Sequence, residues 1–166
     1  MNHPIEILLA DADVLIDYRD SDLTILALVS EYIGRVHVLR EVLAEAPGIS
    51  NRQCARLGIE IVQLETELML EASNLPKSLS VTDRFCVIAC ERNHWTLVTN
   101  DLAMRRLCRE RGIRLRWGLA LMVDLVHAGV LTETRAIEVA TMIQVGNPTH
   151  ITARLIDRFR ARLRER

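Results

Sequence analysis

Short apolar runs recur along the first 118 residues and are interrupted by charged or turn-forming positions. Each run is four to six residues long and rich in Ile, Leu and Val, which is typical of buried strands of a parallel sheet. The first run stops abruptly at Asp11, and Arg40 and Glu65 follow the second and third runs. The pattern therefore predicts five strands, at residues 5–10, 36–39, 59–64, 96–99 and 113–117.

Amphipathic segments with apolar residues at helical spacing separate these runs. Ser80 can cap the segment that follows it, and Gly112 can end the segment before it. The spacing predicts helices at residues 21–33, from Glu41 to Pro47, and at 65–72, 80–92 and 102–111. Beyond Gly118 the pattern is wholly helical, with predicted helices at 119–128, 132–144 and 149–164.

Strands that alternate with helices of this length predict an α/β fold, three layers deep, with a central mostly parallel sheet and a C-terminal helical extension. The chain has 166 residues, which is too short for two ordinary domains of roughly 100 residues or more each. We therefore expect a main domain over residues 1–130 and an extension over 131–166 that packs on the same domain.

Charge is distributed unevenly although the net charge is only −1. Residues 1–83 carry 6 basic and 14 acidic side chains, whereas residues 84–166 carry 15 basic and 8 acidic ones. An acidic region beside a basic surface suits a protein that holds a cation and meets a polyanion, although solvated helix faces give the same pattern.

No apolar run approaches the roughly 18 residues of a membrane span, and no basic leader precedes the first strand. We therefore expect a cytoplasmic protein with no membrane partner. The four cysteines include no Cys-x-x-Cys pair, so we expect buried, reduced thiols.

Acidic residues follow the predicted strands at the point where each strand ends. Asp11, Glu41 and Asp101 occupy such positions, and Asp83 lies in the first turn of the helix before the fourth strand. The carboxyl ends of parallel strands form the edge where open α/β sheets place their ligands. Carboxylates gathered there would repel each other unless a cation neutralised them, and hard oxygen ligands favour Mg²⁺ or Mn²⁺. We expect Asp11, Glu41, Asp83 and Asp101 to form one metal site.

Each of these residues also has a purely structural interpretation. Asp83 completes a capping box with Ser80, Asp101 is placed to cap the following helix, and Glu41 is an ordinary helix residue. Asp11 is harder to explain in this way, because a carboxylate at the end of an apolar strand is costly to desolvate. The case for a metal site depends on the joint placement of the four residues.

Four segments carry a family resemblance: LLADADVLIDY at residues 8–18, LREVL at 39–43, LSVTD at 79–83 and LVTND at 97–101. Over residues 5–118 the chain resembles the PIN-domain family, most closely the VapC-type ribonuclease toxins of prokaryotes. The order and the spacing of the segments both agree with that family. Two features depart from it: Ala12 and Asp13 follow the first aspartate, and the helical extension is longer than in the compact toxins.

The resemblance implies a metal-dependent endoribonuclease that hydrolyses RNA phosphodiester bonds with Mg²⁺ or Mn²⁺. It assigns catalysis and metal binding to Asp11, Glu41, Asp83 and Asp101, with Thr99 forming hydrogen bonds nearby. It also implies a homodimer and an antitoxin protein that blocks the acidic pocket. Asp13 either joins the site or caps a helix.

Two other functions fit parts of the sequence. The segment around Asp11 and Asp13 is similar to the nucleophile motif of haloacid dehalogenase-type phosphatases, but that family needs a lysine and Lys77 is the only one here. A non-catalytic PIN-like module that binds RNA or protein is the other alternative. Arginines at 105, 106, 109 and 111, and an arginine-rich amphipathic helix at the C-terminus, are candidates for contact with an RNA backbone.

Overall fold

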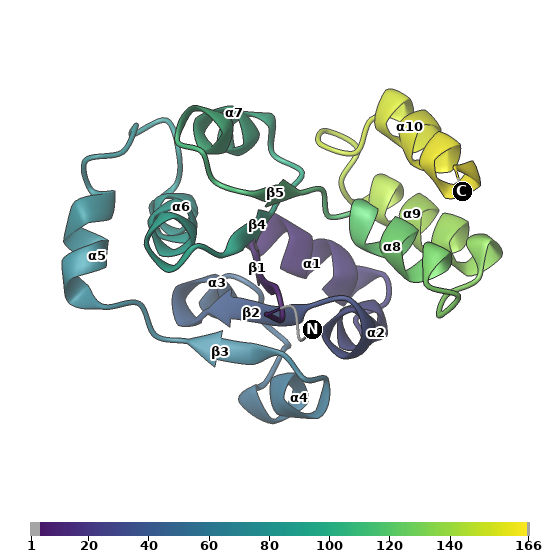
Figure 1. Cartoon of the computed structure of the whole chain (residues 1–166), viewed down its shortest axis with the longest axis horizontal. Coiled ribbons are helices and arrows are strands. Elements are labelled where there is room, and N and C mark those ends of the chain that lie inside the picture. The colour runs from purple at the N-terminus through teal and green to yellow at the C-terminus, as the bar shows by residue number, and fades with distance from the viewer. Residues whose placement is uncertain (1–3, 166) are drawn as a thin grey trace.

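The computed structural model describes residues 4–165 and contains a five-stranded sheet in the middle of the molecule (Figure 1). All neighbouring strands are parallel, and their spatial order is β3-β2-β1-β4-β5. The strands are β1 (Ile7–Ala10), β2 (Arg35–Leu39), β3 (Glu60–Val62), β4 (Thr96–Val98) and β5 (Leu115–Arg116). The predicted α/β class with a central parallel sheet is confirmed.

Every predicted strand is present, but β5 is shorter than the predicted 113–117. Ile113 does not pair in the sheet, because its amide donates to the carbonyl of Cys108 and closes the preceding helix. Gly112, with a φ of +69°, makes that turn possible. The turn that ends the preceding helix therefore includes Ile113, which was predicted to begin the strand.

Helices form the connections between the strands and flank the sheet (Figure 1). The helix capped by Ser50 was not predicted. No range was predicted for the helix that begins directly after Asp11; Asp13 was considered as its cap, but the cap is Asp11 and Asp13 lies in the first turn. The helices are α1 (Ala12–Asp20), α2 (Thr24–Tyr32), α3 (Arg40–Ala44), α4 (Asn51–Arg56), α5 (Thr66–Ala72), α6 (Val81–Asn93), α7 (Leu102–Glu110), α8 (Ala120–His127), α9 (Glu133–Gly146) and α10 (Ala153–Arg164).

The order of the strands reverses beside β1. The chain runs from β1 outward to β2 and β3, and then crosses to the other side of β1 to form β4 and β5. The amide of Asp11 still donates to the carbonyl of Val98 at 3.2 Å, so the ends of β1 and β4 are held together. Such a reversal leaves a crevice at the carboxyl ends of the two strands, where open α/β sheets bind ligands.

Leu, Ile, Val and Ala side chains build the core between the sheet and the helices, as the composition predicts. Leu8, Leu9 and Leu97 are fully buried on the central strands. All four cysteines are buried with free thiols. No helix within residues 4–165 has the length and apolar character needed to cross a membrane.

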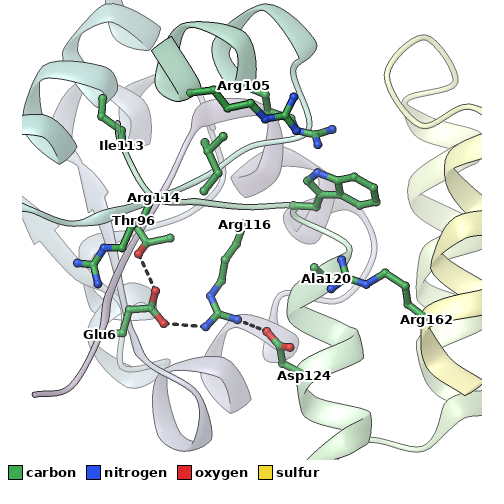
Figure 2. A pocket seen from close by; sticks show the side chains of 12 residues that line it. Glu6, Thr96, Arg105, Ile113, Arg114, Arg116, Ala120, Asp124 and Arg162 are labelled. Atoms are coloured by element: carbon green, nitrogen blue, oxygen red, sulfur yellow. Dashed lines mark hydrogen bonds and ion pairs between the residues drawn. The ribbon is translucent and has the colours of Figure 1, made fainter. Parts of the chain in front are cut away.

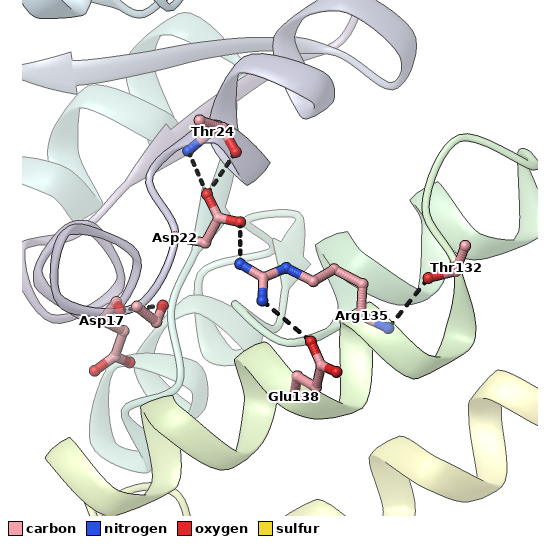
Figure 3. A network of polar contacts seen from close by, with 7 residues as sticks. Asp17, Asp22, Thr24, Thr132, Arg135 and Glu138 are labelled. Carbon is pink, nitrogen blue, oxygen red and sulfur yellow. Dashed lines mark hydrogen bonds and ion pairs between the residues drawn. The ribbon is translucent and has the colours of Figure 1, made fainter.

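The three C-terminal helices α8, α9 and α10 lie together at one end of the molecule (Figure 1). Helix α9 packs against α1, and an ion pair fixes its first turns to the α1–α2 connection. Arg135 contacts Asp22 at 2.8 Å and Glu138 at 3.1 Å, while Asp22 accepts from the amide of Thr24 (Figure 3). The helical extension therefore packs on the elements that begin at Asp11.

Candidate active site

Asp11 is the buried centre of the candidate site. It caps α1, with one carboxylate oxygen accepting from the amide of Val14 at 2.9 Å, and only 1% of the residue is exposed. The pKa of Asp11 is raised to about 8, mainly by burial. The hydrogen bonds from Thr99 and Val14 lower this pKa, and the nearby charges of Asp13 and Asp83 raise it. At neutral pH a carboxyl group with this pKa is mostly protonated, and a nearby cation would favour its ionised form.

Thr99 connects Asp11 to Asp101 at the end of β4. Its buried hydroxyl accepts from the amide of Asp101 at 3.0 Å and forms a hydrogen bond with the carboxylate of Asp11. Asp101 caps α7, and one of its carboxylate oxygens accepts from the amide of Met104 at 2.9 Å. The turn Thr99-Asn100-Asp101 thus places a second carboxylate at the crevice beside β1.

Asp83 enters the site from the first turn of α6. Its amide donates to the hydroxyl of Ser80 at 3.1 Å, which is the predicted capping contact. Burial raises the pKa of its carboxyl; the Ser80 hydrogen bond opposes that rise, and the charges of Asp101, Asp13 and Glu45 add to it. These mutual effects place Asp11, Asp83 and Asp101 in one electrostatic cluster, to which Asp13 also belongs.

Glu41 lies in the first turn of α3, and one of its carboxylate oxygens, Oε2, is buried without a hydrogen-bond partner. The charge of Glu45 helps to raise the pKa of Asp83, whereas Glu41 is not among the main causes of the pKa shift at Asp11 or Asp83. Glu45 follows Glu41 by four residues, on the same helical face, and accepts from the hydroxyl of Thr82 at 2.9 Å. Sequence reasoning missed Glu45, although this spacing was visible.

Asp17 is a second carboxylate that sequence reasoning did not select. It lies on α1, is 6% exposed, and has a pKa raised to about 6 by burial and by the charge of Asp13. Hydrogen bonds from Asn147 and Asn100 oppose that rise. Asp17 belongs to the first segment that resembles the PIN-domain family, which was the available signal. Nothing in the local sequence indicated Asn147.

A small pocket of about 200 Å³ lies beside these residues, between α1 and α9. Asp13, Asp17 and Asp20 line it from α1, and Met142, Ile143 and Asn147 line it from α9 and its end. Asp13 is exposed in this pocket and contributes negative charge to both Asp11 and Asp17. The helical extension therefore forms one wall of the acidic region.

The chain matches no model of a protein family, and no curated protein gives a significant match. Among solved structures it is similar to a PilT N-terminus domain protein from the hyperthermophilic archaeon Sulfolobus solfataricus P2. The TM-score is 0.51 with 12% sequence identity, over 76% of this chain and 95% of that protein. The fold is PIN-like. At this identity the similarity concerns the fold alone, so the function must be argued from the residues.

The acidic residues offer only oxygen donors, which suits Mg²⁺ or Mn²⁺ rather than a thiolate-bound metal. The buried, unpartnered oxygen of Glu41 and the raised pKa of Asp11 both indicate carboxylates that lack a positive partner. Within residues 4–165, however, no three His, Cys, Asp or Glu side chains are close enough to hold one ion together. The structure thus does not bring the four predicted ligands together as one metal-binding group. A Mg²⁺ ion held by one or two carboxylates and several waters would not require such a group.

Proposed function

We propose that the protein is a metal-dependent endoribonuclease that hydrolyses RNA phosphodiester bonds at the crevice between β1 and β4. The observation that carries the proposal is the buried Asp11 carboxylate at the strand reversal, linked through Thr99 to Asp101 and close to Asp83. A PIN-like fold, which generally serves nucleases, supports the same activity.

Asp11, Glu41, Asp83 and Asp101 are the candidates among which we propose that one or two carboxylates hold Mg²⁺ or Mn²⁺. A bound ion of this kind polarises a phosphoryl oxygen and lowers the pKa of a bound water. Because such ions bind through few carboxylates and readily accept phosphate oxygens, the scissile phosphate itself can complete the coordination.

The other residues of the site have positioning roles in this proposal. Thr99 holds the Asp11 carboxylate and the turn at Asp101 in fixed relation. The side-chain oxygen of Asn100 accepts a hydrogen bond of 2.9 Å from the amide of Gly118, and Asn100 also forms a hydrogen bond with Asp17. Asp13 adds negative charge at the crevice, which attracts a cation and keeps the carboxyl pKa values high without one.

The resemblance to VapC-type toxins supports a more specific context: a cytoplasmic toxin that forms a homodimer and is inhibited by an antitoxin that occupies the acidic pocket. This context is part of the proposal and has its own test. The purified protein should elute as a dimer in size-exclusion chromatography, and co-expression with the neighbouring open reading frame should suppress RNA cleavage.

A non-catalytic PIN-like binding module is the competing function, and one observation favours it. Asp11 and Asp101 act as helix caps and Asp83 lies in a capping box, so each has a structural reason to be acidic. The two functions differ in cleavage. A nuclease cuts a mixed RNA pool with Mn²⁺ or Mg²⁺ and stops when EDTA is added, whereas a binding module retains RNA without shortening it under either condition.

A further inference from the structure

A pocket of about 600 Å³ runs along the edge strand β5 and not over the acidic residues. It lies between α7 on one side and α8 and α10 on the other (Figure 2). Its walls include Arg105 and Arg109 from α7, Arg114 and Arg116 from β5 and the residue before it, and Arg162 from α10. We refer to it as the β5-edge groove.

Three arginines lie close to the indole ring of Trp117 at one end of the groove. The guanidinium carbons of Arg105 and Arg158 lie 4.4 Å and 4.3 Å from the centre of the indole ring, and that of Arg162 lies 5.7 Å away. Cation–π contacts of this kind offset part of the cost of bringing cations together. Burial lowers the pKa of Arg105, and the charges of Arg109 and Arg158 lower it further, so the arginines repel one another here.

Few carboxylates neutralise this charge. Arg116 is the exception, because it pairs with Glu6 at 2.8 Å and with Asp124 (Figure 2). No ion pair joins the arginines at 105, 109, 114, 158 or 162 to a carboxylate within residues 4–165. In addition, the Nε of Arg105 is buried without a hydrogen-bond partner. An anion in the groove would supply the partners that these groups lack.

Strand β5 and helix α7, which line the groove, also contact or begin at residues of the candidate active site. The amide of Thr99 donates to the carbonyl of Arg116 at 3.1 Å, so a site residue pairs directly with a residue that lines the groove. Helix α7, which carries Arg105 and Arg109, begins at its cap Asp101. Arg105, which lines the groove, therefore lies one helical turn after Asp101.

We propose that the β5-edge groove binds the sugar-phosphate backbone of the RNA strand whose phosphodiester lies at the acidic site. The inference takes its ligand from the proposed function and adds the location and mode of binding. Guanidinium groups match phosphate geometry. The indole of Trp117 is already covered by guanidinium groups, so a base would have to displace them in order to stack. Recognition in the groove is therefore by backbone charge and not by sequence.

Binding of a fluorescein-labelled single-stranded RNA of mixed sequence, measured by anisotropy in EDTA, tests this inference. The double variant Arg109→Ala/Arg162→Ala removes two exposed cations from the groove. Each phosphate contact in a single strand contributes about 0.7 to the slope of log affinity against log salt. The double variant should therefore lower that slope by about 1.4 and weaken binding roughly 20-fold at 0.1 M salt.

Arg52→Ala/Arg56→Ala is the matched control, because it removes two exposed arginines from α4, which packs beside β3 at the opposite edge of the sheet. It should change affinity less than threefold, as estimated for charges that contact no phosphate. Equal losses in both double variants, or no loss in the groove variant, would overturn the inference. Circular dichroism of both variants checks that the fold is intact.

Two further arms separate the alternatives. Single-stranded DNA of the same sequence should bind the groove with similar affinity, because its backbone carries the same charge. Polyglutamate of equal charge should bind weakly. If polyglutamate binds as tightly as RNA and loses the same affinity in the groove variant, the groove binds an acidic protein segment and the RNA inference is wrong. Because EDTA is present throughout, failure here is distinct from failure to cleave: a nuclease that binds RNA elsewhere would still cut it with Mn²⁺.

Discussion

The side-chain amide of Asn147 donates a hydrogen bond of 3.1 Å to the carboxylate of Asp17, although 130 residues separate the two in the chain. Asp17 lies on α1, the helix that begins directly after Asp11, and Asn147 is the C-terminal cap of α9. The contact joins the C-terminal helices to the acidic region. The C-terminal helical extension therefore contributes a hydrogen bond to the acidic region.

Asn147→Ala should destabilise the protein by roughly 1 to 3 kcal/mol, because it removes a hydrogen-bond donor from a buried carboxylate. The loss of stability should be larger at pH 8 than at pH 5. The pKa of Asp17 is raised to about 6, so the carboxylate is ionised at pH 8, and the hydrogen bond from Asn147 stabilises the ionised form more than the protonated one. Urea unfolding at both pH values measures it. Asn93→Ala, which removes a bond to its own helix at Ala89, should cost less at both. Equal costs for the two variants would contradict a special role for Asn147.

Stability of the metal-free protein should fall as pH rises from about 4 to about 8. The folded pKa values of Asp11, about 8, and Asp17, about 6, both exceed the unfolded value near 3.9. The native state therefore binds more protons than the unfolded state across this range, and stability decreases with pH. Thermal unfolding in EDTA should show a Tm lower by several degrees at pH 8 than at pH 5.

Asp11→Asn should flatten this pH dependence, because it removes the carboxyl with the larger raised pKa. Mn²⁺ should raise the Tm of the wild type more at pH 8 than at pH 5, and should not do so for Asp11→Asn. A wild-type Tm that rises with pH in EDTA would show that Asp11 is not a buried acid with a raised pKa.

Gly118→Ala should destabilise the protein and disturb Asn100. A Cβ at this position would lie 2.7 Å from the side-chain nitrogen of Asn100 and 2.9 Å from a methyl group of Val14. Overpacking of this kind costs roughly 1 to 3 kcal/mol. Gly146→Ala is the control, because no atom lies within 4 Å of its Cβ position and it is in a helix. It should be neutral or stabilise by up to about 1 kcal/mol; chemical denaturation of both variants compares them.

Glu41 and Glu45 should differ in their effect on metal affinity. If Glu41 is a ligand, Glu41→Gln should weaken Mn²⁺ binding by about tenfold or more, because its buried oxygen loses its charge. Glu45→Gln should mainly lower the pKa of Asp83 toward its ordinary value, because the Glu45 charge helps to raise it. Calorimetric titration with Mn²⁺ and NMR titration of Asp83 separate the two. A larger loss of Mn²⁺ affinity in Glu45→Gln would assign the ligand to Glu45.

Much of the fold could be predicted because buried parallel strands and amphipathic helices leave local patterns. The runs that became β1, β2 and β4 were visible, and so was the position of Asp11 at a strand end. Helix α1 was not predicted as an element, although its cap Asp11 was selected for its chemistry. The same residue serves both purposes, and the sequence does not separate them.

The rest of the site depends on tertiary packing, which local patterns do not encode. The Asp17–Asn147 contact bridges most of the chain, and the cluster around Trp117 brings α7 and α10 together from segments about 50 residues apart. The electrostatic link from Glu45 to Asp83 likewise follows from how α3 lies against α6. Periodicity predicts most of the elements but not which side chains of distant elements meet.

Cleavage of a mixed RNA pool by the purified protein is the most direct test of the proposed function. The reactions contain Mn²⁺ or Mg²⁺, with and without EDTA, and compare the wild type with Asp11→Asn and with Asp157→Asn, which removes an exposed carboxylate of α10. We expect cleavage by the wild type and Asp157→Asn, a loss of at least 100-fold in Asp11→Asn, and none in EDTA, since removing a group that acts in the transition state costs on this order. Absence of cleavage by the wild type under every condition, or cleavage by Asp11→Asn at the wild-type rate, would contradict the account.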